Sequence, residues 1–294
     1  MNNDIFSSFK KLSPLSANKL TAITLLILVN LLGCKLPEPS PYDCNTMPEQ
    51  YKNLPETVEY LFILWRPQNE TMTSFKTALF DNIVPQLEAY NPDELKVLVR
   101  EPNIKSLTLR SRPLVDGSNV SAVISFAAST NEEAIAVAQL MQAEASVSFV
   151  AAYKALRAVP RDYTRYWADG VVSPGIQQMT FLQRKVGMAD QPFKDYWFCS
   201  HTPFALDTHP ISRYERNRVT EALTENAPNY DGIVGLHMEN TADLTDLNRF
   251  LAGKIVYWGL RVQVDVLNFL NMNTIEVSAM SEHILKSDFV APSL

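Results

Sequence analysis

Histidine is the side chain best suited to exchanging protons near neutral pH, and its distribution along this chain is uneven. All four histidines of the 294-residue sequence lie in its second half, at His201, His209, His237 and His283. His201 follows Trp197 by four residues, so on a helix both side chains project from one face. This spacing predicts a general acid or base beside an aromatic wall. The alternative is a hydrogen-bonded core histidine that holds its helix against a sheet.

A second candidate, His237, lies in a segment that alternates with a period of two residues. Over 230–239 this period places Asp231, Gly235 and His237 on one face of a strand. Gly235 leaves room beside the imidazole, so the three positions could line a small pocket. We therefore predict His201 and His237 as catalytic residues, with Trp197 and Asp231 in contact with substrate. The alternative place for Asp231 is the turn that leads into the strand.

Two further residues are candidates for substrate contact. Tyr214, with Arg213 and Arg216, offers phenol and guanidinium donors to an anionic or phenolic ligand, although such groups are often simply solvated. Glu282 and His283 are neighbours on a predicted strand and point to opposite faces, so they cannot line one pocket. We take His283 as the candidate.

The spacings that metal and nucleotide sites need are missing. The histidines form neither an HxH nor an HxxxH pattern, so no divalent metal site is predicted. The sequence has no G-x-G-x-x-G, P-loop or G-x-S-x-G motif, which disfavours nucleotide cofactors and the usual serine hydrolase arrangement. We expect no cofactor, with haem ligated by His201 or His237 as the alternative.

These candidates lie in the second copy of an internal repeat. An offset of 118 residues without a gap aligns seven identical pairs in a 29-residue window: Leu64/Leu182, Arg66/Arg184, Phe75/Phe193, Lys76/Lys194, Phe80/Phe198, Pro85/Pro203 and Pro92/Pro210. Such agreement is hard to obtain by chance, so we infer two copies of one unit. His201 aligns with Ile83, which indicates that the fold itself needs no polar group there.

Hydrophobic periodicity predicts similar elements in both copies. The first reads as a strand over 58–65, a helix capped by Thr73 or Ser74 and running to residue 90, strands over 94–100, 106–112 and 120–129, and a long helix over 131–158. The second reads as strands over 176–185, 214–223, 230–239 and 274–285, a helix capped by Asp190, and helical material over 244–269. Pro85 and Pro203 predict a kink or an end in the first helix of each copy.

This order of elements is typical of the ferredoxin-like βαββαβ unit. One such sheet leaves an apolar face uncovered, so two copies should pack face to face. The predicted fold is therefore α+β, with two ferredoxin-like units at 57–170 and 171–294 fused as a dimeric α/β barrel. Exposed sheet edges leave further self-association open.

The start of the chain has the features of a lipoprotein signal. Lysines precede an apolar run at 20–32, which at about 13 residues is short of the ~20 that span a bilayer. The run ends in Leu-Leu-Gly-Cys, which resembles a lipobox and predicts a signal peptide over 1–33 and a lipidated Cys34. The alternative is an uncleaved anchor. The proline-rich segment 34–56 is then a tether. We expect a lipid anchor in the cell membrane or the outer membrane, with the folded part on the periplasmic or extracellular side.

The net charge bears on which partners the protein can bind, and the cysteines bear on whether it contains a disulfide. The formal net charge of −6, without a basic stripe, argues against nucleic-acid binding. Cys44 and Cys199 remain once Cys34 is lipidated. An oxidising compartment permits a disulfide between them, and a buried unpaired Cys199 is the alternative.

Motifs spread over about 174–286 carry a family resemblance: the strand 181–185 (FLQRK), Phe193, Tyr196-Trp197, His201-Thr202-Pro203, His209-Pro210, Tyr214, Arg216-Asn217, Tyr230-Asp231-Gly232-Ile233 and Glu282-His283. They resemble the EthD domain of the dimeric α/β barrel superfamily, and the first copy looks like a degenerate version without histidine. The resemblance implies association with oxidation pathways or aromatic polyketide tailoring. Related barrels bind small hydrophobic molecules between sheet and helices, sometimes with haem.

We therefore predict an EthD-like extracytoplasmic lipoprotein that acts on a small apolar or aromatic molecule without a nucleotide cofactor. His201 would move protons, His237 or Tyr214 would orient the ligand, and Trp197 would form a wall. The alternatives are a noncatalytic module that binds a small hydrophobic ligand in the same pocket, and a haem-binding barrel relative.

Overall fold

The fold is described from a computed structural model of the chain. It covers residues 42–47, 49–51, 54–104, 115, 119–253 and 255–289, with 255–258 as backbone alone. The predicted signal peptide, Cys34, most of the tether and the predicted strand 106–112 lie outside these residues. All described residues belong to one compact unit, 39–294.

The apolar run near residue 60 forms a strand buried on both faces, as its composition predicts. β1 spans Thr57–Trp65. Tyr60, Phe62 and Leu64 pack against helices of the first half of the chain, whereas Leu61 and Ile63 contact residues from strands of both halves. A continuous apolar run, rather than an alternating one, follows from burial on both sides.

Within the described residues, each half of the chain contributes four strands and a set of helices. The first half contains β1, α2 (Met72–Ala78), a π-helical turn η3 (Leu79–Ile83), α3 (Val84–Ala89), β2 (Leu95–Arg100), β3 (Ala122–Phe126), α4 (Asn131–Gln142) and β4 (Phe149–Arg161). The second contains β5 (Ile176–Leu182), α5 (Asp190–Asp195), a π-helical turn η4 (Tyr196–His201), α6 (Thr202–Thr208), β6 (Arg213–Ala222), β7 (Gly232–Met238), α7 (Thr241–Thr245), α8 (Leu247–Phe250), α9 (Ile255–Phe269) and β8 (Glu276–Lys286). A short 3₁₀ turn, η2 (Glu49–Tyr51), precedes them.

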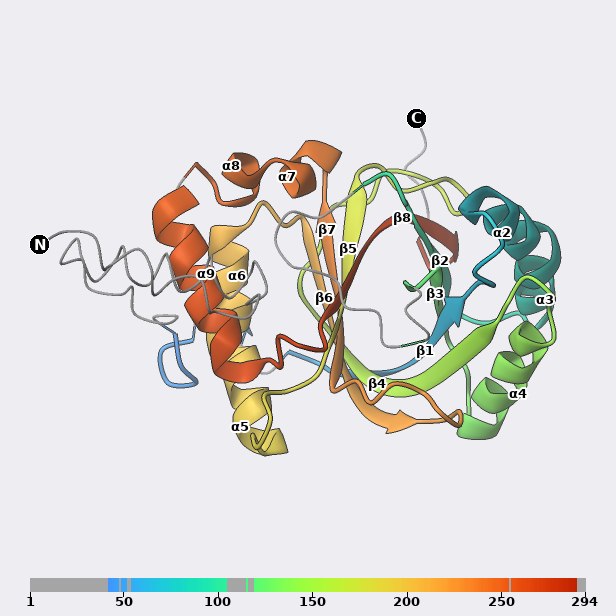
Figure 1. Cartoon of the computed structure of the whole chain (residues 1–294), viewed down its shortest axis with the longest axis horizontal. Helices are drawn as coiled ribbons and strands as arrows, with labels where there is room; N and C mark the ends of the chain where they lie inside the picture. The colour runs from blue at the N-terminus through green and yellow to red at the C-terminus, as the bar shows by residue number, and fades with distance from the viewer. Residues whose placement is uncertain are drawn as a thin grey trace, which may run out of the picture. The chain divides into compact units, whose positions relative to one another are not determined.

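Among the described residues, eight antiparallel strands close into a barrel in the order β1-β3-β2-β8-β5-β7-β6-β4. Within each half the order is fourth, first, third, second, and the halves join where β2 pairs with β8 and β4 pairs with β6. The helices α2, α3 and α4 cover one side of the barrel, and the helices of the second half cover the opposite side (Figure 1). The predicted α+β class and the single closed core are confirmed.

The first helix of each half has the same irregularity. In both, an α-helix runs into a π-helical turn and then into another α-helix whose second residue is proline, Pro85 or Pro203. Proline lacks an N–H, and a π-turn locally changes which carbonyls the following residues bond. The helix therefore continues past each proline instead of ending there. Pro85 and Pro203 thus occupy equivalent positions in the two halves, as the 118-residue offset predicts.

The predicted long helix over 131–158 is wrong in its second half. The helix ends at Gln142, and Phe149–Arg161 forms β4, which pairs with β1 along nine residues from Thr57↔Arg157 to Trp65↔Phe149 and with β6 on its other edge. Alanine, leucine and lysine favour helix only weakly, and pairing on two edges overrides that preference.

Two predicted helix caps are also wrong. Thr71, and not Thr73 or Ser74, accepts the capping hydrogen bond at the start of α2. Asp190 lies in the first turn of α5, whose cap position is Ala189. Such one- or two-residue shifts are the usual uncertainty at helix ends. In the part of the chain that the structure describes, no helix is both long and apolar enough to cross a bilayer.

Candidate functional site

His201 is positioned by the last turn of η4, which packs against α9. Its Nδ1 lies 2.5 Å from Oδ2 of Asp265, a residue of α9 whose side chain is 0% exposed. The imidazole packs against the ring of Phe269, with 4.8 Å between centroids, and keeps 19% of its side-chain surface exposed. A part-exposed histidine is thus held by a fully buried carboxylate.

The same carboxylate also binds Tyr196. The Tyr196 hydroxyl donates to Oδ1 of Asp265 at 3.1 Å and accepts from Asn268 at 3.0 Å. Burial and the nearby Asp265 charge raise the pKa of Tyr196 to about 12, so its proton stays on the phenol at neutral pH. In the tautomer with its proton on Nδ1, His201 donates to Asp265, and Nε2 is left as the acceptor.

Nε2 of His201 has no hydrogen-bond partner among the described residues. An imidazole whose Nδ1 is held by a carboxylate and whose Nε2 is unengaged has the form of a general base. On protonation, the imidazolium would be stabilised by Asp265, which lies at hydrogen-bond distance. This pair can therefore accept a proton from a group at the surface between η4 and α9.

Trp197 and Tyr214 contact one another on the sheet side of the same helix. The Trp197 indole donates to the Tyr214 hydroxyl at 3.1 Å, and both side chains are fully buried. Trp197 stacks near Phe193, which in turn lies close to Phe269. These rings join His201 to one aromatic cluster, but they fill the space between helix and sheet rather than border a cavity.

His237 lies on the other side of the sheet. On β7 it shares its face with Gly235, which abuts Gln177 and Met179 inside the barrel. Its Nε2 donates to the carbonyl of Pro174 at 2.8 Å, and Nδ1 is 2.7 Å from the hydroxyl of Ser212. Burial lowers the pKa of His237. Both nitrogens are engaged, and the structure does not bring His237 and His201 together.

The remaining predicted contact residues are separate from His201. Asp231 accepts from the backbone N–H of Arg184 at 2.8 Å and lies 3.5 Å from its guanidinium, at the turn that enters β7. His283 faces the helices of the first half, 4.7 Å from the ring of Phe80. Of the predicted set, His201, Trp197 and Tyr214 share one neighbourhood, and the others lie elsewhere.

The surroundings of neither proposed iron ligand fit a haem. His237 has both ring nitrogens engaged. Beneath His201, the space that a flat macrocycle would need is filled by fully buried Trp197, Phe193 and Phe269. We therefore derive no step through a haem. Among the described residues no cluster of three or more His, Cys, Asp or Glu side chains is arranged for a metal ion.

Asp265, Tyr196 and Asn268 are site residues that the sequence reading missed. A signal did exist, because Asp265 is the single acidic residue in the apolar α9 segment IVYWGLRVQVDVLNF. A lone acid on a helix that packs against a sheet needs a buried partner. Its partner could not be named from sequence, because 64 residues separate it from His201.

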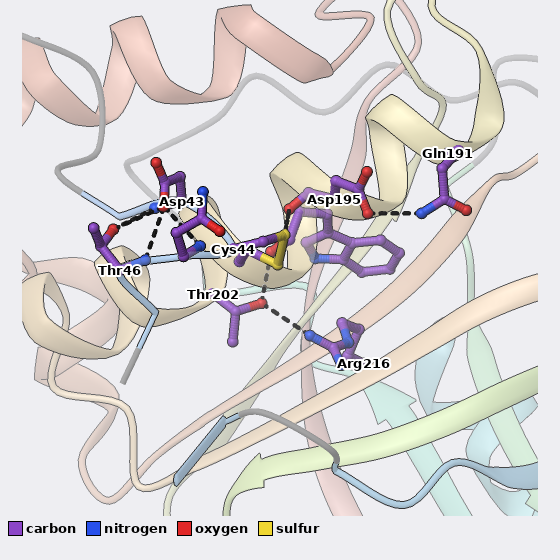
Figure 2. The surroundings of a disulfide bond; sticks show 10 residues. Asp43, Cys44, Thr46, Gln191, Asp195, Thr202 and Arg216 are labelled. Atoms are coloured by element: carbon purple, nitrogen blue, oxygen red, sulfur yellow. Dashed lines mark hydrogen bonds between the residues drawn. A yellow bond between two sulfur atoms is a disulfide. The ribbon is translucent and has the colours of Figure 1, made fainter. Parts of the chain in front are cut away.

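Cys44 and Cys199 form a disulfide beside this site. Of the two possibilities that the sequence left open, Cys199 is therefore paired and not a buried free thiol. Figure 2 shows Cys44 near Asp195, with Thr202 and Arg216 on the other side of the sulfur atoms. Nearby, Met47 and Tyr51 pack into the hydrophobic cluster that contains Trp197. The N-terminal segment is thus fixed against the helices that carry His201.

Comparison with known proteins gives a limited result. No family model matches the chain, and no curated protein matches it. Solved structures that resemble it include an anthrone oxidase-like protein (TM-score 0.49, 7% identity, 83% of this chain and 98% of the other). Others are a dye-decolorizing peroxidase from Bacteroides thetaiotaomicron (0.41, 9%, 79% and 96%) and a chlorite dismutase from Candidatus Nitrospira defluvii in complex with imidazole (0.39, 10%, 76% and 91%). These values are too low to support an argument about function.

Proposed function

We propose that this protein is a proton-transfer enzyme in which His201 is the general base and Asp265 is its positioning residue. The observation that carries the proposal is the hydrogen bond from Nδ1 of His201 to the fully buried Asp265, with Nε2 unengaged among the described residues. Tyr196 and Asn268 support it by holding the second oxygen of the same carboxylate.

The proposed substrate is a small aromatic or apolar molecule with an acidic C–H or O–H group. Nε2 of His201 takes the proton, and the imidazolium that forms is stabilised by Asp265. The electron pair left on the substrate delocalises into its own carbonyl or ring. A proton returned from solvent then completes an exchange, so the step needs no oxidant and no cofactor.

The test uses 2-tetralone, an aromatic ketone with acidic C–H bonds, in deuterated buffer. Mass spectrometry would follow deuterium incorporation with the full-length protein. We expect exchange to fall by about 10²-fold or more in His201→Gln, the usual contribution of a positioned acid or base. Exchange by His201→Gln at the wild-type rate would refute the role of His201.

Asp265→Asn separates a positioning role from a structural one. It should shift the pH profile of exchange and lower the rate, because an amide cannot stabilise the imidazolium as a carboxylate does. Asp93→Asn, at an exposed position without a side-chain partner among the described residues, is the matched control. Loss of folding in Asp265→Asn, with His201→Gln folded and fully active, would favour the purely structural alternative.

The wider assignment is also a proposal. The EthD resemblance of the second half, the 118-residue repeat and the shared strand order within each half support two ferredoxin-like units of common origin. The disulfide supports an oxidising, extracytoplasmic location. The lipid anchor at Cys34 can be checked by labelling cells with an alkyne fatty acid, since Cys34→Ala should remove the label.

A further inference from the structure

A cavity of about 490 Å³ opens at one end of the barrel, on the side of the sheet opposite to His201. Its walls come from strands of both halves, with Lys96 on β2 and Arg157 on β4 from the first, and Arg213 on β6 from the second. The linker between the halves and the residues after β8 complete the rim. The volume lies within the range of about 300–1,000 Å³ that is common for small-molecule sites.

The wall of this cavity is rich in cationic donors. Among the described residues, five cationic side chains reach it, against two carboxylates, Glu94 and Asp162; the cations are Lys96, Arg157, Arg165, Arg213 and Lys286. The two lining carboxylates pair with two of these cations, Arg157 with Glu94 at 2.8 Å and Arg213 with Asp162 at 3.5 Å, so the wall keeps an excess of cationic groups.

Carboxylates that do not line the cavity hold these cations in place from behind. Nζ of Lys96 lies 2.6 Å from Oε2 of Glu215, and the Arg213 guanidinium is 3.3 Å from the same oxygen. Arg157 is 3.0 Å from Oε2 of Glu59. Glu59 and Glu215 are both buried. Donors fixed in this way need little reordering when they bind a ligand.

Lys286 differs from the other four cations. Its Nζ donates to the side-chain oxygen of Asn91 at 2.6 Å, and among the described residues it has no acidic partner. It therefore presents an uncompensated charge at the cavity wall, close to the end of β8.

Apolar side chains lie between these cations, and Ile284 is the cross-strand partner of Lys96. Val159, Ile284 and the ring of Phe289 are among the apolar groups that line the cavity. The Arg165 guanidinium lies 4.6 Å from the centroid of that ring and donates to Ser287 at 2.7 Å, which holds the segment after β8 against the linker. The cavity thus offers a ligand both cationic donors and apolar surface for a hydrocarbon body.

We propose that this cavity is a second ligand site, which binds a small organic anion with its carboxylate or phenolate near Lys286, Arg213 and Lys96 and its aromatic or aliphatic body against Phe289 and Ile284. The site is independent of His201. Arg213, grouped in sequence with Tyr214 and Arg216 as a donor set, is the member of that group that reaches this cavity.

The test measures binding of 2-naphthoate by isothermal titration calorimetry with the full-length protein. Its neutral analogue 2-naphthamide and inorganic phosphate are the comparison ligands. We expect saturable binding of 2-naphthoate and about tenfold weaker binding of 2-naphthamide, which lacks the charge-assisted hydrogen bonds. Phosphate, which has no apolar body, should bind weakly. Equal affinity for the acid and the amide, or no saturable binding of either, would overturn the proposal.

Two variants locate the site. Lys286→Gln removes a part-exposed charge without an acidic partner, and Phe289→Ala removes the aromatic wall, so each should weaken 2-naphthoate binding by about tenfold. Lys185→Gln, on an exposed turn of the second half, is the matched control and should bind as wild type. His201→Gln should also bind as wild type, so a failed exchange assay leaves this test unaffected. Unchanged affinity in both Lys286→Gln and Phe289→Ala, with folding verified by circular dichroism, would place binding elsewhere and refute the site.

Discussion

At the scale of single residues, the four histidines differ in which of their nitrogens are engaged and in how deeply they are buried. His201 keeps a part-exposed ring, whereas His209, His237 and His283 are buried. Burial lowers the pKa of His209 and of His283 to about 4 and also lowers that of His237. A buried imidazole stays neutral because the charged form loses its hydration. All four have the same side chain, but of the four only His201 combines a part-exposed ring with a buried carboxylate at hydrogen-bond distance.

His209 should control part of the acid stability of the fold. Its folded pKa is about 4 against 6.5 for the unconstrained group, so the unfolded state binds the proton first as pH falls. The stabilisation is fully present above pH 6.5 and is lost between pH 6.5 and about 4, at up to about 1.4 kcal/mol per pH unit. His209→Gln can keep the hydrogen bond to the Phe250 carbonyl. In urea unfolding, it should reduce the slope of the unfolding free energy against pH over this range.

An unfolding free energy whose slope against pH is the same in His209→Gln and wild type would contradict that reading. His209 packs 4.0 Å from the ring of Phe250, so the variant will also lose a constant amount of packing energy. The slope, and not the absolute value, is therefore the quantity to compare.

At the scale of elements, a close contact with β7 determines the position of the helix that carries His201. A Cβ on Gly232 would lie 2.5 Å from Cη2 of Trp197 and 2.9 Å from Cδ1 of Leu182. Glycine at this position lets the indole lie directly on the strand. The contact fixes the distance between the π-turn and the sheet, and with it the height of His201 above the barrel.

Gly232→Ala should therefore destabilise the fold by roughly 1–3 kcal/mol through overpacking. Trp197→Phe in the same chain should recover part of this loss, because the smaller ring leaves room for the methyl group. Gly259→Ala is the matched control, since its Cβ would make an ordinary contact at 3.5 Å on a helix. Additive effects of Gly232→Ala and Trp197→Phe in denaturant unfolding would show that the two residues do not compete for space.

The disulfide ties the N-terminal segment to the same helix over a separation of 155 residues. The chain-entropy model gives roughly 5 kcal/mol for a loop of that length, as an upper value. We expect dithiothreitol to lower the melting temperature of wild type clearly, and that of the Cys44→Ser/Cys199→Ser double variant not at all. An equal response of both proteins would mean that the reductant acts elsewhere.

At the scale of the whole molecule, buried charges join the two halves inside the barrel. Lys96 comes from the first half and Glu215 from the second, and Glu276 of the second half accepts from the backbone N–H of Val120 in the first. Burial alone would raise the pKa of Glu215, but Lys96, Arg213 and Arg157 outweigh it and hold the pKa well below its ordinary value. Closure of the barrel therefore adds Lys96 of the first half to the Arg213–Glu215 pair of the second half.

Lys96→Met should destabilise the protein by about 3 kcal/mol, because it leaves Glu215 buried with Arg213 as its remaining close cation. Lys96→Met/Glu215→Leu should be less destabilised than the sum of the two single variants, since removal of both charges also removes the desolvation cost. Strict additivity in urea unfolding would mean that the two side chains do not interact.

Sequence patterns accounted for much of the architecture. The two-residue period of 230–239 predicted β7 and the shared face of Gly235 and His237, and the repeat predicted equivalent positions for Pro85 and Pro203. These features depend on local spacing, which the order of residues alone determines. The same reading grouped His201 with His237, although a helix and the inner face of a strand place them on opposite sides of the sheet.

What the sequence by itself determined is thus most of the strands and helices, their repetition and the alternation of faces along β7. Tertiary structure decided that Phe149–Arg161 is a strand, that Asp265 meets His201, that Cys44 meets Cys199, and which charges line the end of the barrel. The physical reason is the same in each case. These contacts join residues far apart in the chain, and they exist only once strand pairing around the closed barrel has set the register.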